Sequence, residues 1–226
     1  MGGYQPRNAD TRGGAVMGLS FSRQELRDLL VAWLALGLAF TLLLQPQFRS
    51  ALLGRVGDLT LASVISTLVV SLLTVGVGFL LHELAHKVVA VRFGQVAAFR
   101  ADYRMLGFAI VGALVGFLFA APGAVVHRGR ISAKENGLIA LAGPVTNLLL
   151  ALVFLVPFLL LVGTDGFLTD LASRGLQINL LLAGFNMLPF GPLDGRKVRA
   201  WSNVVFFVVA VPSILLAFAA LFLVPF

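Results

Sequence analysis

The sequence has 226 residues, of which 59% are hydrophobic and only 12% are charged, with a formal net charge of +7. Soluble globular domains carry about 25% charged residues, so this chain has too few polar side chains to cover a folded surface in water. The positive charge does not indicate nucleic acid, because the 17 lysines and arginines are spread over short segments between apolar runs, as in loops at lipid headgroups. The lack of cysteine excludes disulfides and thiolate metal sites. We therefore expect an integral membrane protein with the lipid bilayer as its solvent.

Six long apolar runs follow one another along the chain. They lie at residues 29–45, 61–92, 105–126, 138–163, 175–190 and 202–226. A helix needs about 20 residues to cross a hydrocarbon core of about 30 Å, which predicts an all-α, polytopic membrane protein. No cleavage pattern follows the first run, so it is interpreted as a span and not as a signal peptide. We expect residues 1–28 to form a basic cytoplasmic segment and residues 29–226 a membrane-embedded domain with its core at 61–200.

The positions of lysine and arginine distinguish two topologies. If all six runs cross the membrane, the two sides carry 9 and 8 positive residues. If the run at 105–126 enters and leaves on one side, the counts become 14 and 3. Positive residues gather on the cytoplasmic side, which favours five spans with the N-terminus inside. Glycines and Pro122 within this run suit a re-entrant or β-hairpin-like segment at about 97–126.

The candidate catalytic motif is the pentad His82-Glu83-Leu84-Ala85-His86. The chain has only three histidines and three glutamates, so coincidence explains this motif poorly. Residues four apart share a helix face, which lets both imidazoles reach one metal ion. Glu83 projects to one side, where it can take a proton from a water activated by the metal. Polar residues lining a pore are the less favoured alternative, because ionisable groups at membrane depth are costly and usually functional.

A catalytic zinc site needs a third protein ligand, and Asp194 is the favoured candidate. It follows an apolar run that two prolines and two glycines interrupt, which lets a carboxylate turn into the helix bundle. In the five-span topology, Asp194 emerges on the same membrane side as His82 and His86. In the six-span topology it emerges on the opposite side. His127 lies in a basic loop and is interpreted as a surface residue, and Glu135 as an acid at a helix start.

Two further segments carry candidate site residues. Gly143 permits close approach of helices, Pro144 is tolerated near a helix start, and Asn147 is placed to hydrogen-bond across helices. A packing role for these three is at least as well supported as a catalytic one. Asn186 precedes the candidate third ligand in broken helix, where its amide can contact substrate or an oxyanion; a structural role is equally open. Gly143, Pro144, Asn147 and Pro189 are therefore candidates for structural or substrate-gating roles.

Taken together, the motifs resemble those of the site-2 protease family of intramembrane zinc metalloproteases. The matching segments are Phe79-Leu80-Leu81-His82-Glu83-Leu84-Ala85-His86, Ala142-Gly143-Pro144-Val145-Thr146-Asn147 and Asn186-Met187-Leu188-Pro189 through Pro192-Leu193-Asp194-Gly195. Their order and spacing cover residues of about 61 to 200. This chain has Arg196 where many members of the family have a glycine.

The resemblance implies one catalytic zinc ion held by His82, His86 and Asp194, with Glu83 as the general base. It implies hydrolysis of peptide bonds within or near transmembrane helices of substrate proteins, which are the expected partners, and it suggests Asn186 as a substrate or oxyanion contact. We expect a three-helix catalytic core formed by residues 61–92, 138–163 and 175–194, with its active-site side facing the cytoplasm, in a multi-pass protein of the cell membrane. Some members of the family carry a soluble domain after the last span.

Two other functions fit parts of the sequence. A membrane-anchored zincin acting on soluble or misfolded chains needs a third ligand in a polar domain after His86, where only His127 and Glu135 qualify. A non-enzymatic metal transporter needs further ionisable residues in several spans, and the other spans have almost none. For a protease, the substrate helix must unwind locally, and the 105–126 segment is a candidate to offer it an edge strand by β-augmentation.

Overall fold

The computed structural model describes residues 18–52, 54, 60–117 and 122–224. The first half contains α1 (Arg23–Leu44), α2 (Pro46–Leu52), α3 (Leu61–Ser71), the π-helical segment η1 (Leu72–Gly76) and α4 (Val77–Arg92). A small unit follows, made of β1 (Val96–Ala101), α5 (Tyr103–Leu114) and β2 (Gly123–Arg128). The second half contains α6 (Ala133–Leu161), α7 (Phe167–Asn186), α8 (Asp194–Trp201) and α9 (Asn203–Leu223).

Four helices within the described ranges are long and apolar enough to cross a membrane. They are α1, the continuous helix Leu61–Arg92, α6 and α9. The predicted all-α polytopic fold is therefore confirmed. The fifth predicted span corresponds to α7, which has 20 residues but is not among the four; its first half carries Asp170 and Arg174, which lower its apolarity.

The run at 105–126 is not a span in the structure. Its helix, α5, has only 12 residues, which at about 1.5 Å per residue is too short for a core of about 30 Å. It lies between two strands that pair antiparallel, with Val96 opposite Arg128 and Ala101 opposite Gly123. The predicted β-hairpin-like segment is thus a strand–helix–strand unit, and its sheet starts one residue before the predicted residue 97.

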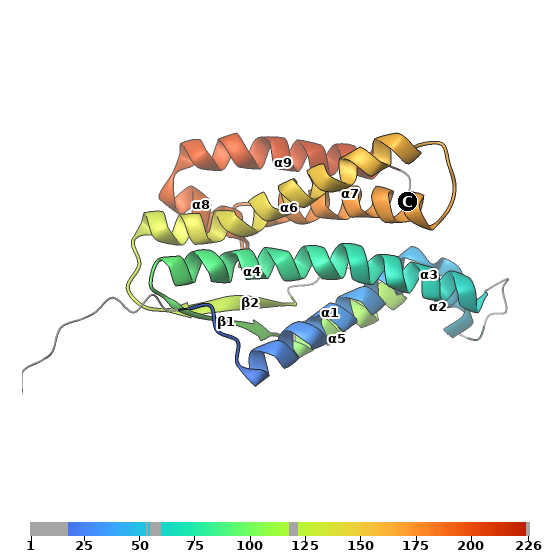
Figure 1. Cartoon of the computed structure of the whole chain (residues 1–226), viewed down its shortest axis with the longest axis horizontal. Coiled ribbons are helices and arrows are strands. Elements are labelled where there is room, and N and C mark those ends of the chain that lie inside the picture. The colour runs from blue at the N-terminus through green and yellow to red at the C-terminus, as the bar shows by residue number, and fades with distance from the viewer. Residues whose placement is uncertain (1–17, 53, 55–59, 118–121, 225–226) are drawn as a thin grey trace, which may run out of the picture.

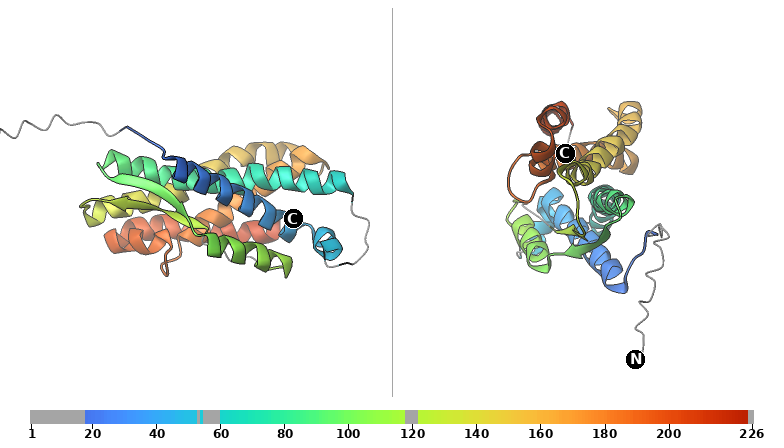
Figure 2. Two further views of the ribbon diagram at one scale, coloured as in Figure 1. Left: turned by 90° about the horizontal axis from the view of Figure 1, so that it is seen from below. Right: turned by 90° about the vertical axis from the view of Figure 1, so that its left-hand side faces the viewer.

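The central helix α4 lies between two groups of elements (Figures 1 and 2). On one side, α6, α7, α8 and α9 pack together, and on the other lie α1, α5 and the two-stranded sheet. A hydrophobic core between α1, α4 and the sheet includes Leu36, Phe79, Phe99 and Leu106, all of them buried. The Leu61–Arg92 helix therefore touches both groups, and it carries the His-Glu-x-x-His motif in its second half.

Two core helices begin earlier than the apolar runs indicated. The helix α6 starts at Ala133 and not at 138, because Ser132 and Glu135 form a capping box in which each side chain binds the other residue's backbone N–H. The assignment of Glu135 as a helix-start acid is confirmed. The helix α7 starts at Phe167 and not at 175, and ends at Asn186, so the predicted bound of 194 is wrong. A turn then leads into α8, which begins at Asp194.

Candidate metal centre and active site

The two motif histidines lie one helical turn apart on α4 and face α6. Gly143 of α6 is the residue they meet: a Cβ atom built there would lie 2.5 Å from Nε2 of both His82 and His86. No ordinary side chain fits at that distance, so glycine lets the two helices approach closely enough to bring α6 against the imidazoles. At Gly143 the two helices therefore approach each other closely.

Substitution of Gly143 by alanine gives a sharp test of this contact. We expect the added methyl group to displace both imidazoles, because overpacking of this kind costs about 1–3 kcal/mol. The bound-metal content of the purified protein and its thermal stability should both fall. The matched control is Gly107→Ala inside α5, where an added Cβ meets nothing within 4 Å; it should leave the metal content unchanged and should not lower thermal stability, because alanine is the better helix former. Equal behaviour of the two variants would contradict the contact.

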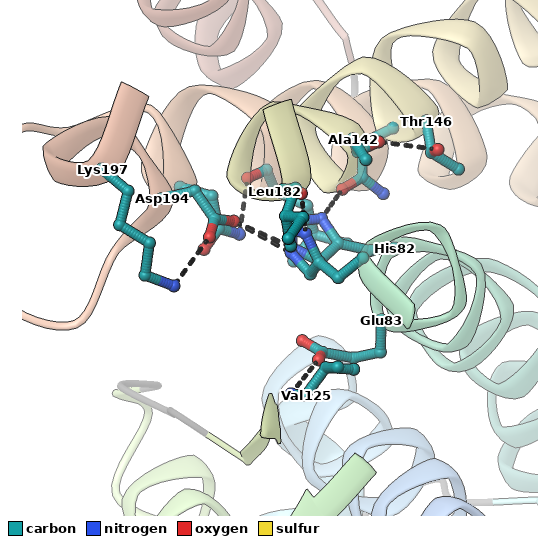
Figure 3. Close-up of polar contacts among 12 residues, drawn as sticks. His82, Glu83, Val125, Ala142, Thr146, Leu182, Asp194 and Lys197 are labelled. Carbon is teal, nitrogen blue, oxygen red and sulfur yellow. Dashed lines mark hydrogen bonds and ion pairs between the residues drawn. The ribbon is translucent and has the colours of Figure 1, made fainter. Parts of the chain in front are cut away.

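Asp194 completes a group of three possible metal ligands at the start of α8. Its Oδ2 atom lies 3.3 Å from Nε2 of His82 and 3.1 Å from Nε2 of His86, and the two Nε2 atoms are 3.0 Å apart. All three side chains are buried, and Figure 3 shows Asp194 reaching the imidazoles from α8. The close turn before α8 depends on Gly195, whose Cβ would lie 2.2 Å from the carbonyl oxygen of Met187. The structure thus brings together the three residues expected from the sequence.

The hydrogen bond of Nδ1 fixes the tautomer of His82. Its Nδ1 lies 2.6 Å from Oδ1 of Asn147. The orientation of this amide is set, because Nδ2 of Asn147 donates to the carbonyl oxygen of Gly78 at 3.2 Å and to Oδ1 of Asn179 at 3.0 Å. An amide oxygen only accepts, so Nδ1 of His82 carries the proton. Asn147 therefore orients a site residue, as the prediction of a hydrogen bond across helices indicated.

The tautomer of His86 is fixed in the same way. Its Nδ1 lies 2.7 Å from the backbone carbonyl oxygen of Ile139, which can only accept, so this nitrogen also carries the proton. In the neutral imidazoles the Nε2 lone pairs of His82 and His86 then point toward each other and toward the Asp194 carboxylate. Three acceptors converge within 3.0–3.3 Å, and a cation at their centre satisfies all three at once.

These residues fit a zinc ion in chemistry and in spacing. Two imidazole nitrogens and one carboxylate form a known donor set for catalytic zinc, which keeps a fourth position open. Tetrahedral bonds of about 2.0–2.1 Å place neighbouring ligand atoms about 3.3 Å apart, close to the observed 3.0–3.3 Å. The protonated Nδ1 atoms and their carbonyl partners supply the outer hydrogen bonds that usually orient metal-ligating histidines.

Glu83 is buried beside this group but points to the sheet. Its Oε2 atom accepts a hydrogen bond from the backbone N–H of Val125 on β2 at 3.1 Å (Figure 3). The carboxylate is therefore held by the strand and is not part of the His82–His86–Asp194 group. It stands one residue from His82 along α4 and on the side of the metal group that faces the sheet. This position suits a group that exchanges protons with a bound reactant.

The remaining predicted residues occupy several environments. Pro144 is buried in α6 and Pro189 is half-buried in the turn after α7. Nδ2 of Asn186 donates to the carbonyl oxygen of Leu182 in its own helix at 2.9 Å. His127 does not lie in a surface loop as predicted: it is on β2, half-buried on the same strand face as Val125. Burial lowers the pKa of His127 below its ordinary value.

Two site residues were not anticipated from the sequence. Asn179 of α7 accepts from the Asn147 amide and thereby fixes the residue that orients His82. Lys197 of α8 lies 3.5 Å from the outer carboxylate oxygen, Oδ1, of Asp194 and is drawn beside it in Figure 3. A helix starting at Asp194 would have placed Lys197 on the same face, three residues on. The three-residue spacing of Asp194 and Lys197 could have indicated this contact, but the start of α8 at Asp194 was not predicted.

Comparison with known proteins identifies the family. The chain is 39% identical over 197 residues to the protein named "Putative zinc metalloprotease MJ0611" of Methanocaldococcus jannaschii, and the match covers 86% of this chain and 93% of that relative. The chain belongs to this zinc metalloprotease family. The metalloprotease is also 36% identical over 143 residues to "Putative zinc metalloprotease YwhC" of Bacillus subtilis, which covers 56% of the chain and 65% of the relative.

A longer relative shares part of the metalloprotease. "Putative zinc metalloprotease Rip3" of Mycobacterium tuberculosis is 36% identical over 125 residues, which are 54% of this chain and 28% of Rip3. No family model matches the metalloprotease chain, and no solved structure matches it. The family therefore follows from the curated relatives and agrees with the converging acceptors in the structure.

Proposed function

We propose that this chain is an intramembrane zinc metalloprotease of the site-2 protease type, which hydrolyses peptide bonds within or near transmembrane helices of substrate proteins. The observation that carries the proposal is the convergence of three buried acceptors, from His82, His86 and Asp194, on helices of a largely membrane-spanning fold. A transporter would need a path of ionisable groups through several spans. Here the ionisable groups form one compact site, in which the Asp194 carboxylate completes the possible ligands and the Glu83 carboxylate lies beside them.

Each site residue receives one role in this proposal. His82, His86 and Asp194 would hold the zinc ion. When bound, zinc polarises the scissile carbonyl and makes water nucleophilic near neutral pH. Glu83 takes a proton from the attacking water and returns it to the leaving amine. The Val125 N–H, 3.1 Å from Oε2 of Glu83, holds the carboxylate in place and leaves its other oxygen for the water.

Lys197 and Asn186 are proposed to act at the same site. The ammonium group of Lys197, half-exposed and 3.5 Å from Oδ1 of Asp194, keeps that oxygen turned from the imidazoles. It also brings positive charge near the oxygen of the scissile carbonyl, which gains negative charge during hydrolysis. The Asn186 amide uses one N–H on the Leu182 carbonyl oxygen and has a second with which to contact the substrate backbone.

The sheet suits the presentation of an unwound substrate. A helical peptide has its carbonyl groups hydrogen-bonded and covered, so the cleaved segment must be extended. Within the described part of the chain, β2 pairs only with β1, and its other edge faces Glu83 through Val125. We propose that the substrate adds to this edge as a strand, which places its backbone along the catalytic carboxylate.

We propose, from the distribution of positive residues, that the active site lies on the cytoplasmic side of the cell membrane. With α5 too short to cross, the segments that flank the site carry most of the lysines and arginines, as expected for cytoplasmic loops. Transmembrane proteins of the same bilayer are the proposed substrates.

A comparison of two substrates in lipid vesicles tests the proposed function against the anchored zincin. The purified protein should cleave a single-span reporter, stop after a zinc chelator and resume when zinc is restored. An unfolded soluble protein of similar length, added outside the vesicles, should be cut at least about tenfold more slowly, because it does not enter the bilayer beside α4. Preferred cleavage of the soluble chain would reject intramembrane action and favour the anchored zincin.

A further inference from the structure

The two-stranded sheet is held by one carboxylate at each edge. Phe99 of β1 and Val125 of β2 are cross-strand partners, and their N–H groups point away from each other. The Val125 N–H donates to Oε2 of Glu83 at 3.1 Å. The Phe99 N–H donates to Oε1 of Glu25, on α1, at 3.0 Å. The pair of residues that positions the proposed general base is therefore fixed from the opposite side by a second acid.

Glu25 is itself anchored on the catalytic helix. Nζ of Lys87 donates to Oε1 and Oε2 of Glu25 at 2.6 and 2.7 Å, and to the carbonyl oxygen of Ser20 at 2.5 Å. The ring of Phe21 covers the same ammonium group, with its centroid 3.8 Å from Nζ. Both Glu25 and Lys87 are only 1% exposed, so the pair lies wholly inside the protein.

These contacts close a ring around the sheet. Lys87 follows Glu83 by four residues on α4 and so lies on the same helix face. The ring runs from Glu83 to β2, across to β1, then through Glu25 on α1 and Lys87 back to α4. A displacement of the sheet relative to α4 must therefore break a hydrogen bond or pull apart the buried ion pair.

Stability alone is a weak reason for this ion pair. Taking two charges out of water costs several kcal/mol per ion, and well-packed apolar residues often replace such pairs with no loss of stability. A position-setting role needs one feature that apolar residues lack, namely an acceptor for the Phe99 N–H. Glu25 supplies this acceptor, and Lys87 orients its carboxylate.

We propose that Glu25, held by Lys87, is a positioning residue for the general base. Glu25 fixes the position of β1 relative to α4. Because Phe99 of β1 pairs with Val125 of β2, this also keeps the Val125 N–H within hydrogen-bonding distance of Glu83. The inference rests on the proposed role of Glu83. Proton transfer needs heavy-atom distances of about 2.6–3.2 Å, and a misplacement of about 1 Å can lower the rate by about 100-fold.

Two double variants that differ in one acceptor test the proposal. Glu25→Gln with Lys87→Met removes both charges and keeps an oxygen for the Phe99 N–H. Glu25→Leu with Lys87→Met removes both charges and that oxygen. Expressed per bound zinc, kcat on the single-span reporter should stay within about threefold of wild type in the first variant. In the second it should fall at least about tenfold, because only there does the Phe99 N–H lose its acceptor on α1.

Further variants separate positioning from folding. Tyr103→Phe removes the hydrogen bond of 2.6 Å from the Tyr103 hydroxyl of α5 to Oδ1 of Asp28 on α1. This contact lies near Glu25 but binds no backbone N–H of the sheet, so the variant should leave kcat unchanged. If the leucine variant gives no zinc-loaded protein, the exchange Glu25→Lys with Lys87→Glu keeps an ion pair but removes the acceptor, and should also lower kcat at least about tenfold.

The outcome distinguishes this inference from the proposed function. Equal kcat values per bound zinc in the glutamine and leucine double variants, whether high or low, would overturn the positioning role of Glu25. If Glu83→Gln is inactive in the same assay, the proposed function survives that result. If Glu83→Gln cleaves like wild type, the proposed role of Glu83 fails first, and the positioning role fails with it.

Discussion

Replacement of Glu83 by glutamine should lower kcat by about 100- to 10,000-fold, the usual contribution of a general acid–base residue, while zinc stays bound. Glutamine has the same shape and still accepts from the Val125 N–H, which lies 3.1 Å from the native carboxylate. It has no charge with which to take the proton of the attacking water. Single-turnover cleavage of the reporter measures the loss of rate, and the metal content of the same sample measures the retention of zinc.

The matched control is Glu135→Gln. This glutamate closes the capping box at the start of α6 and is half-buried, away from the metal group. Its replacement should cost at most about 1 kcal/mol of helix stability and leave kcat unchanged. A Glu83→Gln protein that cleaves at the wild-type rate would contradict the assignment of the base.

Substitution of Asp194 by alanine should lower zinc affinity by more than about 100-fold, because loss of a hydrogen-bonded outer residue alone costs about 10- to 100-fold. The variant leaves the Nε2 lone pairs of His82 and His86 facing each other at 3.0 Å without the carboxylate that completes the ligand set. Competition with a chromophoric chelator measures the affinity, and reporter cleavage should disappear with the metal.

His127→Ala is the variant to compare with Asp194→Ala in the same zinc-affinity measurement. His127 is the remaining histidine and the candidate ligand of a water-exposed zincin, but it lies on β2 outside the group formed by His82, His86 and Asp194. We expect it to keep its zinc. Loss of zinc from His127→Ala together with retention in Asp194→Ala would reverse the ligand assignment and favour the exposed catalytic domain.

The grouping of His82, His86 and Asp194 could be predicted because it depends on coarse features. The spacing of His82 and His86 implies a common helix face, and the distribution of positive charge predicts that Asp194 emerges on the same membrane side. Both features follow from helical periodicity and a bilayer of known thickness. The structure adds the reason for the glycine at position 143, whose missing Cβ leaves room for both imidazoles.

The polar contacts around the ligands could not be predicted in the same way. The bond from Asn147 to His82 and the ring through Glu25 and Lys87 join segments far apart in the sequence. Each depends on the register of packed helices to within about one turn, which hydropathy does not determine. Lys87 is an example: next to His86 in the sequence it reads as a basic residue at a membrane edge, yet it is buried against an acid of α1.

Helix starts were missed for a related reason. The apolar runs mark the part of a helix that faces lipid or core, whereas α6 begins where Ser132 supplies a cap. The first half of α7 is polar enough to resemble a loop, but it continues the helix that packs along α6. The segment between α4 and α6 was predicted only as re-entrant or hairpin-like, because the short helix α5 within it carries the apolar signal of a span.

The position of the cut in a single-span reporter shows whether this protein cleaves within the membrane. The purified protein and reporter are placed together in lipid vesicles, and the products are sized by mass spectrometry, with Glu83→Gln as the inactive control. We expect a zinc-dependent cut within the apolar segment or a few residues from its cytoplasmic end. A zinc-dependent cut found only in water-exposed parts of the reporter, with the apolar segment intact, would contradict it.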